Sequence, residues 1–153
     1  MSVIACRGVT RAYAHRGIDP VVAVNGVDLV IDEGTFVAVQ GPSGSGKTTL
    51  LGLLAGLEPP DAGEITVLGH DLARLSAAER ARLRQRRIGI VFQSFGLIAS
   101  LRAGENVELP LALAGVSARE RGVRARAALD EVGLGACEGA RIDELSGGER
   151  QRV

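Results

Sequence analysis

The sequence predicts an α/β fold, and three observations lead to that prediction. Runs rich in β-branched side chains, which favour strands, recur through the first 70 residues. A short apolar run at 36–40 is followed by a glycine-rich loop and then by a leucine-rich segment, in the order strand, loop, helix. From residue 76 onward, serines followed three residues later by glutamate indicate helix starts. Strands are therefore expected mainly in the first half of the chain and helices in the second.

Three β-prone runs make up most of the strand-rich part. They cover residues 3–13, 21–31 and 64–68. Glycine-containing turn signals lie between and within them, at Gly17, Asn25-Gly26 and Asp61-Ala62-Gly63. Further strands are expected at 36–40, where an apolar run is bounded by glycine, and at 88–93, where an apolar run ends in Gln93.

The strongest motif lies at 41–48, which fits the phosphate-binding pattern GxxxxGK[ST]. Its glycines let backbone N–H groups approach phosphate oxygens, and the helix predicted at 47–57 adds a partial positive charge at its start. Lys47 supplies a charge for the β and γ phosphates, and the Thr48 hydroxyl is placed to bind Mg²⁺. The alternative is a glycine-rich turn that merely starts a helix. The predicted phosphate-binding residues are Gly41, Pro42, Ser43, Gly44, Ser45, Gly46, Lys47, Thr48 and Thr49.

A second motif follows Leu145 and consists of Ser146, Gly147, Gly148 and Glu149. Serine with glutamate three residues later fits a capping box, which starts a helix. A serine-capped helix start is also an anion site, so the structural and the functional interpretation are compatible. Ser117 and Glu120 predict another capped helix that continues to about Val132.

Taken together, these motifs resemble the ABC-type ATPases, over the whole chain and in the order found in that family. The segment 145–151 is similar to the family's signature sequence, and Gln93 to its Q-loop. The resemblance implies that Tyr13 stacks on adenine, that Lys47 and Gln93 act in catalysis, and that Thr48 with Gln93 holds Mg²⁺. It also implies that residues 146–149 contact an ATP molecule held by a partner subunit. The segments 86–98, 105–111 and 145–153 look most like the subgroup that serves lipoprotein-release and macrolide-export systems.

The resemblance further implies a fold and a function. The expected fold is a P-loop NTPase core with an N-terminal antiparallel β subdomain and an α-helical signature subdomain. Residues 1–93 would form the β subdomain and core, and residues 94–153 the helical subdomain. The expected function is that of an ATP-binding subunit, paired with a second copy of itself. It would couple ATP hydrolysis to export or lipoprotein extraction by a membrane permease at the inner face of the cell membrane.

The family's Asp-Glu strand and switch histidine, expected after the signature, do not occur in the 153 residues. Phosphoryl transfer depends on such positioned charges. The chain is therefore expected to be an incomplete ABC ATPase domain, ending after the signature and inactive alone. Two other functions stay open: a soluble ABC ATPase outside transport, and a non-catalytic remnant.

Charge and hydropathy exclude some partners. The net charge is +0, which argues against a nucleic-acid-binding surface, and the arginine run at 80–87 is interpreted as a solvated helix face. The apolar stretch 50–57 is far shorter than the roughly 20 residues that span a bilayer. Residues 95–113 allow two interpretations: core of the helical subdomain, or a groove for a membrane partner's helix.

Overall fold

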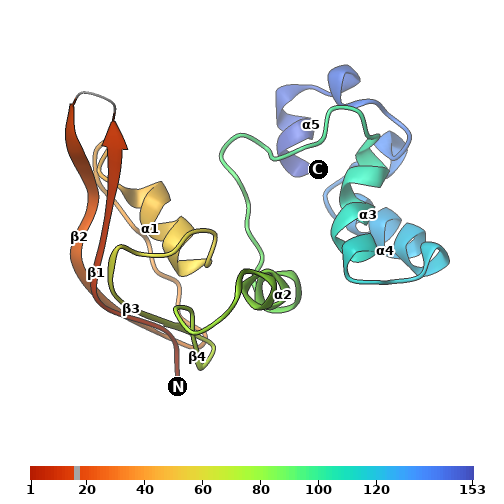
Figure 1. Ribbon diagram of the computed structural model, residues 1–153. Helices are drawn as coiled ribbons and strands as arrows, with labels where there is room; N and C mark the ends of the chain where they lie inside the picture. Colours follow the sequence, from red (N-terminus) through yellow and green to blue (C-terminus); the bar gives the residue numbers. More distant parts are fainter. Residues whose placement is uncertain (16–17) are drawn as a thin grey trace. The chain divides into compact units, whose positions relative to one another are not determined.

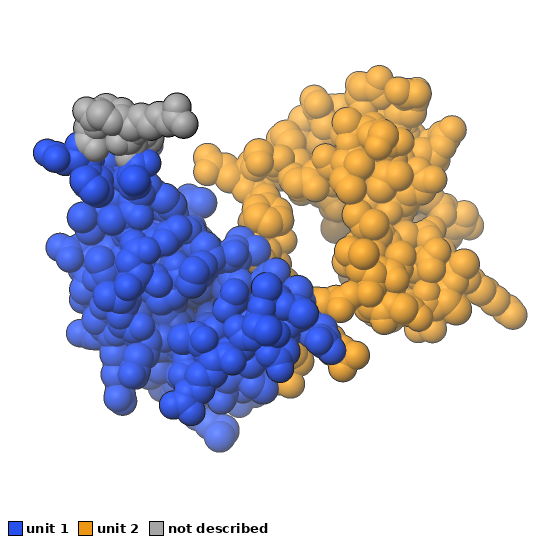
Figure 2. Space-filling model, viewed as in Figure 1, with its two compact units in different colours: residues 1–84 blue, residues 85–153 orange. Residues whose placement is uncertain are grey.

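The computed structural model describes residues 1–15 and 18–153, which form two compact units (Figure 2). Unit 1 is Met1–Arg84 and unit 2 is Gln85–Val153. The predicted turn at Gly17 lies outside the described residues. The sequence motifs predicted a boundary between residues 93 and 94, whereas the two compact units are divided between Arg84 and Gln85. The motif boundary stays a prediction.

Unit 1 contains a sheet in the order β2-β1-β3-β4, with antiparallel pairing throughout (Figure 1). The strands are β1 (Ser2–His15), β2 (Ile18–Asp32), β3 (Ala62–Val67) and β4 (His70–Asp71). This sheet confirms the expected antiparallel β subdomain. The short strand β4 was not predicted, because two residues are too few to show a periodic pattern.

The predicted turn at Asn25-Gly26 is wrong, because β2 continues through these residues. Instead the β1–β2 ladder changes register between Cys6 and Arg11, opposite this position. Gly8 and Gly26 both have positive φ, 58° and 60°, and the Gly8 N–H donates to Asp28 Oδ1 at 2.7 Å. A bulge and a turn both use glycine for its left-handed conformation, so the local sequence does not distinguish them.

Helix α1 (Lys47–Leu54) begins directly after the glycine-rich loop, as predicted, and ends three residues before the predicted end at Leu57. Gly56 takes a left-handed conformation, with φ of 66°, and stops the helix. The helix buries Leu53 and Leu54. The buried apolar side chains of unit 1 come from the sheet, α1 and the segment after β4: Cys6, Val9, Val24, Leu53, Leu54, Ile65, Val67 and Leu72.

Helix α2 (Ala77–Arg87) starts at the predicted capping box. The Ser76 hydroxyl donates to Glu79 Oε2 at 2.7 Å, and the Glu79 N–H donates back to Ser76 Oγ at 3.3 Å. Two of its arginines are not simply solvated. Arg80 donates to the carbonyl oxygens of Leu72 and Leu75, and Arg84 donates to that of Gly56 at 2.6 Å. Arg80 fixes the turn that leads into α2, and Arg84 joins α2 to the end of α1. The remaining arginines fit the predicted solvated face.

The strands predicted at 36–40 and 88–93 are wrong. Both segments are irregular, and neither belongs to a ladder within the described residues. Phe36 and Val91 are each 95% exposed. A strand needs a hydrogen-bonded neighbour as well as β-prone side chains, and in the described part of the chain these segments have none.

Unit 2 is helical, with α3 (Ala103–Leu113), α4 (Ala118–Glu131) and α5 (Gly147–Arg152), and with the short 3₁₀ turns η1 (Gly135–Cys137) and η2 (Ile142–Glu144). Ser117 caps α4 as predicted, accepting from the Glu120 N–H. Leu97 packs on a buried cluster of Ala103, Ile142 and Leu145, which supports the core interpretation for that residue. Phe95 and Ile98 remain 44% and 43% exposed. Among the described helices, none is long and apolar enough to cross a membrane.

Candidate phosphate-binding site

The glycine-rich loop ends at a helix start that offers free donors. Gly46 is the N-cap of α1, with φ of 84°, and supplies no side-chain acceptor. An α-helix provides no carbonyl acceptor for its first amide N–H groups, which here belong to Lys47, Thr48 and Thr49. Their partial positive charge and open donors make this helix start suited to an anion.

The loop is packed against the hairpin through Gly46. A Cβ on this residue would lie 1.9 Å from the Ala23 carbonyl oxygen of β2, whereas a Cβ on Gly44 would meet nothing within 4 Å. Both glycines have positive φ. Gly46 is therefore required for its conformation and for its close approach to β2, while Gly44 is required for conformation alone.

Lys47 turns its side chain back onto the loop. Its ammonium Nζ donates to the carbonyl oxygens of Gly41 at 2.9 Å and Pro42 at 2.7 Å, and to Ser45 Oγ at 3.4 Å. The cation is thereby held against the loop that leads into α1, and the neighbouring Thr48 is exposed. A lysine ammonium, a row of free amides and an open hydroxyl are the groups that a polyphosphate with a hard divalent cation requires.

Tyr13 lies at the end of the hairpin that contacts the loop. In the β1–β2 ladder Tyr13 pairs with Val21, Ala12 with Val22 and Arg11 with Val24, so Ala23 lies directly beside this part of β1. Because Gly46 packs on Ala23, the Tyr13 side chain and the loop belong to one region of unit 1. The Tyr13 hydroxyl donates to Glu58 Oε1 at 2.6 Å.

The predicted capping box of the second motif is present at the start of α5. The Glu149 N–H donates to Ser146 Oγ at 3.3 Å, and the Ser146 N–H donates to Glu149 Oε2 at 2.8 Å. The Ser146 side chain, and after it the Ser146 backbone N–H, hold the pKa of the Glu149 carboxyl below its usual value. Gly147 and Gly148 are exposed, and Leu145 is buried in the core of unit 2.

The predicted site residues fall into two groups. Tyr13 and the loop come together in unit 1, while Gln93 and residues 146–149 belong to unit 2, where Gln93 is exposed in a turn. Sequence reasoning missed Arg11 and Glu58, which contact Tyr13. Glu58 lies about 45 positions after Arg11 and Tyr13 in the sequence. A motif that covers a few neighbouring residues cannot predict contacts between such distant positions.

Comparisons with known proteins show which family and which relatives this chain is similar to. A sequence model of the family described as ABC transporter matches residues 24–153. The lipoprotein-releasing system ATP-binding protein LolD of Chromohalobacter salexigens is 44% identical over 99% of this chain. The macrolide export ATP-binding/permease protein MacB of Marinobacter nauticus is 43% identical over the same share. The chain spans 63% of LolD and 23% of MacB.

A solved structure shows the same fold. The ATP-binding cassette MJ0796, described as a dimer in a post-hydrolysis state bound to ADP and Pi, superposes with a TM-score of 0.91 and 38% identity. The match covers 97% of this chain and 66% of that one. It confirms the α/β phosphate-loop fold class predicted from the sequence.

Proposed function

This chain belongs to the ABC transporter family, and we propose that it is an ATP-binding subunit whose ATP hydrolysis drives export or lipoprotein extraction by a membrane partner. The observation that carries the proposal is the loop at 41–48, which leads into an uncapped helix start and whose carbonyl oxygens hold the Lys47 ammonium. The names of LolD and MacB, which refer to lipoprotein release and to export, support the direction of transport.

Each predicted site residue takes a role in this proposal. The backbone of 41–46 and the N–H groups of 47–49 bind the phosphates, with Lys47 beside the β and γ phosphates. Tyr13 stacks on the adenine base. Thr48 and Gln93 supply oxygen ligands to Mg²⁺, which neutralises phosphate charge when bound. Lys47 opposes the charge that develops during phosphoryl transfer, and Gln93 orients groups at the γ-phosphate.

The second motif acts on a nucleotide bound elsewhere. We assign Ser146, Gly147, Gly148 and Glu149 to the ATP of a second copy of this chain, so that two subunits enclose two ATP molecules. The dimeric state named for MJ0796 supports this assembly. MacB joins an ATP-binding part and a permease in its name, which supports a membrane permease as the other partner, reached at the inner face of the cell membrane.

The chain's single lysine makes the phosphate assignment directly testable. Lys47 and the Met1 amine are the two primary amines, and Met1 is exposed and lies within unit 1. Reductive methylation followed by mass spectrometry therefore reports on Lys47 with Met1 as an internal reference. We expect MgATP to slow methylation of Lys47 by roughly tenfold or more, since a charge-assisted contact with phosphate covers the amine, and to leave Met1 unchanged.

AMP, which lacks the β and γ phosphates, is the control ligand and should protect Lys47 little. An equal rate of Lys47 methylation with and without millimolar MgATP would contradict the proposal that Lys47 contacts the phosphates. The transport part is tested separately, by purifying the full chain together with a permease encoded beside it. Failure of the chain to co-purify with that permease in the presence of MgATP would count against a role in transport.

A further inference from the structure

Tyr13 belongs to a half-buried cluster that the motifs did not predict. Arg11 and Tyr13 project from the same face of β1, two residues apart, and Glu58 follows α1. The two oxygens of Glu58 are divided between them. Oε2 accepts from Arg11 Nε at 2.9 Å, and Oε1 accepts from the Tyr13 hydroxyl at 2.6 Å. The Arg11 and Glu58 side chains are 22% and 28% exposed.

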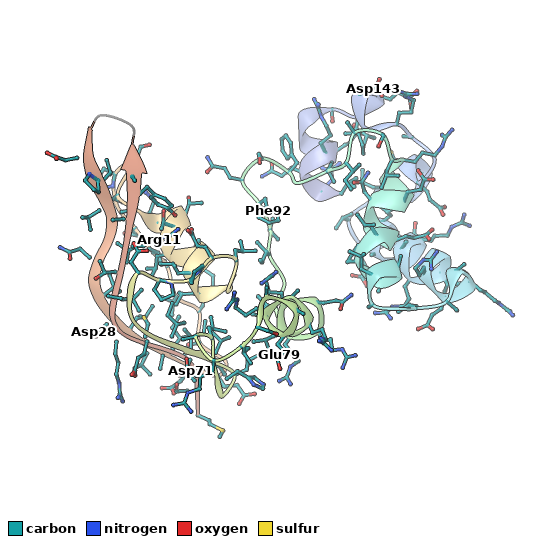
Figure 3. The ribbon with its side chains drawn as sticks, viewed as in Figure 1. Arg11, Asp28, Asp71, Glu79, Phe92 and Asp143 are labelled. Carbon is teal, nitrogen blue, oxygen red and sulfur yellow. The ribbon has the colours of Figure 1, made fainter. Side chains whose placement is uncertain are left out.

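The Tyr13 ring is held at two places. Its hydroxyl is fixed by Glu58, and one ring face is covered by the Arg11 guanidinium, whose Cζ lies 5.0 Å from the ring centroid. A guanidinium at this distance from an aromatic face makes a favourable cation–π contact. Figure 3 shows Arg11 between the hairpin and α1. Two contacts at different points of one ring restrict both of its side-chain torsions.

The segment that carries Glu58 is itself rigid. Pro59 and Pro60 follow it, and a residue before proline is restricted to extended backbone. Asp61 then ties the segment to β1: its N–H donates to the Thr10 carbonyl at 2.9 Å, and its carboxylate accepts from the Ala12 N–H at 2.7 Å. Asp61 also accepts from Arg11 Nη1 at 2.6 Å. Glu58 is thus a fixed point against which the ring is oriented.

The same helix connects this cluster to the phosphate loop. Helix α1 begins at Lys47, and the chain reaches Glu58 four residues after the helix ends at Leu54. Gly46 packs against Ala23, next to the strand positions that pair with Arg11 and Ala12. One short helix therefore has the phosphate-binding groups at its start and the support of Tyr13 after its end.

We propose that Glu58, together with Arg11, is a positioning pair that holds the Tyr13 ring with one face on the guanidinium and the other face open to the adenine base. This inference rests on the proposed role of Tyr13 in nucleotide binding. Glu58 and Arg11 do not touch the nucleotide; they remove the freedom that the ring would otherwise lose when the base stacks on it. Ordering a side chain in advance lowers the entropic cost of binding.

The test compares two ligands on the full chain. MgATP contains both base and phosphates, whereas inorganic tripolyphosphate with Mg²⁺ contains only the phosphate chain. We expect Glu58→Ala to weaken MgATP binding by roughly threefold to tenfold, the cost of ordering one freed side chain, and to leave tripolyphosphate binding unchanged. Isothermal titration calorimetry measures both affinities.

Three further variants separate positioning from a general effect. Glu64→Ala removes an exposed carboxylate from β3 of the same unit and should change neither affinity. Glu58→Gln retains an acceptor for the Tyr13 hydroxyl but loses the charge that faces Arg11, so its MgATP affinity should lie between those of the wild type and Glu58→Ala. Tyr13→Phe should cause no additional loss in the Glu58→Ala background, since the hydroxyl then has lost its partner.

A spectroscopic readout is available because Tyr13 is the chain's single tyrosine and tryptophan is absent from the sequence. Its fluorescence anisotropy without nucleotide reports the mobility of this ring alone. We expect faster depolarisation in Glu58→Ala than in the wild type and in Glu64→Ala. A folded Glu58→Ala variant with unchanged ring mobility would overturn the proposal.

The outcomes distinguish this inference from the proposed function. Wild-type chain that binds neither ligand, or binds them independently of Lys47, would remove the proposed function and with it this inference. Wild-type chain that binds MgATP through Lys47 and Tyr13, while Glu58→Ala and Glu58→Gln behave like Glu64→Ala, would keep the function and remove the positioning role. In that case the cluster only joins β1 to the end of α1.

Discussion

The phosphate loop and the signature turn are both glycine-containing helix starts, yet their donors are in opposite states. At α1 the N-cap is Gly46, which offers no side-chain acceptor, so the first amides stay open. At α5 the N-cap is Ser146, which accepts the Glu149 N–H, and the Glu149 carboxylate accepts the Ser146 N–H. The sequence alone suggested two comparable anion sites. The structure shows one with open donors and one whose donors are partly satisfied by its own side chains.

This difference follows from the charge at each helix start. Lys47 brings a cation to the first helix, and Glu149 brings an anion to the second. At the first site a phosphate meets open backbone donors and a lysine, with no acidic residue in the first turn of the helix. At the second it meets the exposed Gly147 and Gly148 amides together with a nearby carboxylate, so binding there is expected only when another charged group contributes. This asymmetry agrees with a second site that acts on a nucleotide held by a partner.

The largest expected effect is a loss of folding stability when glycines near the two helix starts are replaced by alanine. Gly46→Ala should lower the free energy of unfolding by about 3 kcal/mol, because the methyl group would both strain a left-handed residue and meet the Ala23 carbonyl. Gly44→Ala carries the strain without the contact and should cost about 1 kcal/mol. Gly148→Ala, in an open helical position, should be neutral or slightly stabilising. Chemical denaturation measures all three, and equal losses for Gly46→Ala and Gly148→Ala would contradict the comparison.

The next effect concerns Lys47. Lys47→Ala should weaken MgATP binding by about 2 kcal/mol, roughly 30-fold, because a charge-assisted contact is lost at an otherwise uncapped helix start. Calorimetry with MgATP measures the change. Arg82→Ala removes an exposed cation on α2, outside the loop, and serves as the control. A folded Lys47→Ala variant that binds MgATP as the wild type does would show that the open amides alone define the site.

A smaller effect is expected from the caps in unit 2. Ser146→Ala should cost about 1 kcal/mol of stability, the usual value of a lost N-cap. Ser117→Ala, at the start of α4, is a matched control with a similar cost. Only Ser146→Ala should also reduce nucleotide-dependent self-association, which analytical ultracentrifugation with MgATP would detect. Equal self-association of the two variants would limit Ser146 to capping.

The smallest effect is a pH dependence of the α5 start. The pKa of Glu149 is lowered in the folded chain by its hydrogen bonds with Ser146, from an ordinary value of 4.5. Its stabilising contribution is therefore complete above about pH 4.5 and is lost as the pH falls through the lower folded value. Glu149→Gln should remove this acid-dependent loss. Amide exchange of residues 147–152 measured between about pH 3 and 6 would follow it, and identical profiles for both chains would contradict the assignment.

Local hydrogen bonds explain which parts of the structure could be predicted from the sequence. The starts of α2, α4 and α5 depend on caps whose partners lie three residues apart, so Ser76, Ser117 and Ser146 were placed correctly. The start of α1 at Lys47 has no side-chain cap and was placed correctly by its glycine-rich motif. The antiparallel sheet was also expected, although the bulge at Gly26 resembled a turn. Segments 36–40 and 88–93 were predicted as strands because their side chains favour that state, but pairing is a non-local property that these residues do not encode.

The same reasoning applies to the site. The loop and the signature could be found because their residues are consecutive, and their functional roles stay proposals. The support of Tyr13 by Arg11 and Glu58 could not be found, since it joins residues 11, 13 and 58 through tertiary contact. An acidic residue before two prolines has no distinctive pattern of its own. Only the folded arrangement shows that this carboxylate binds two side chains of β1.

The packing of Gly46 on Ala23 also has an evolutionary consequence. A gene copy released from selection for nucleotide binding would still need Gly46, because any side chain there collides with the hairpin. Lys47 would be free to drift, since its own contacts are with loop carbonyl oxygens on an exposed surface. Among homologous chains, loss of the lysine with retention of the preceding glycine would therefore identify folded descendants that have abandoned ATP, whereas joint loss would indicate decay of the fold itself.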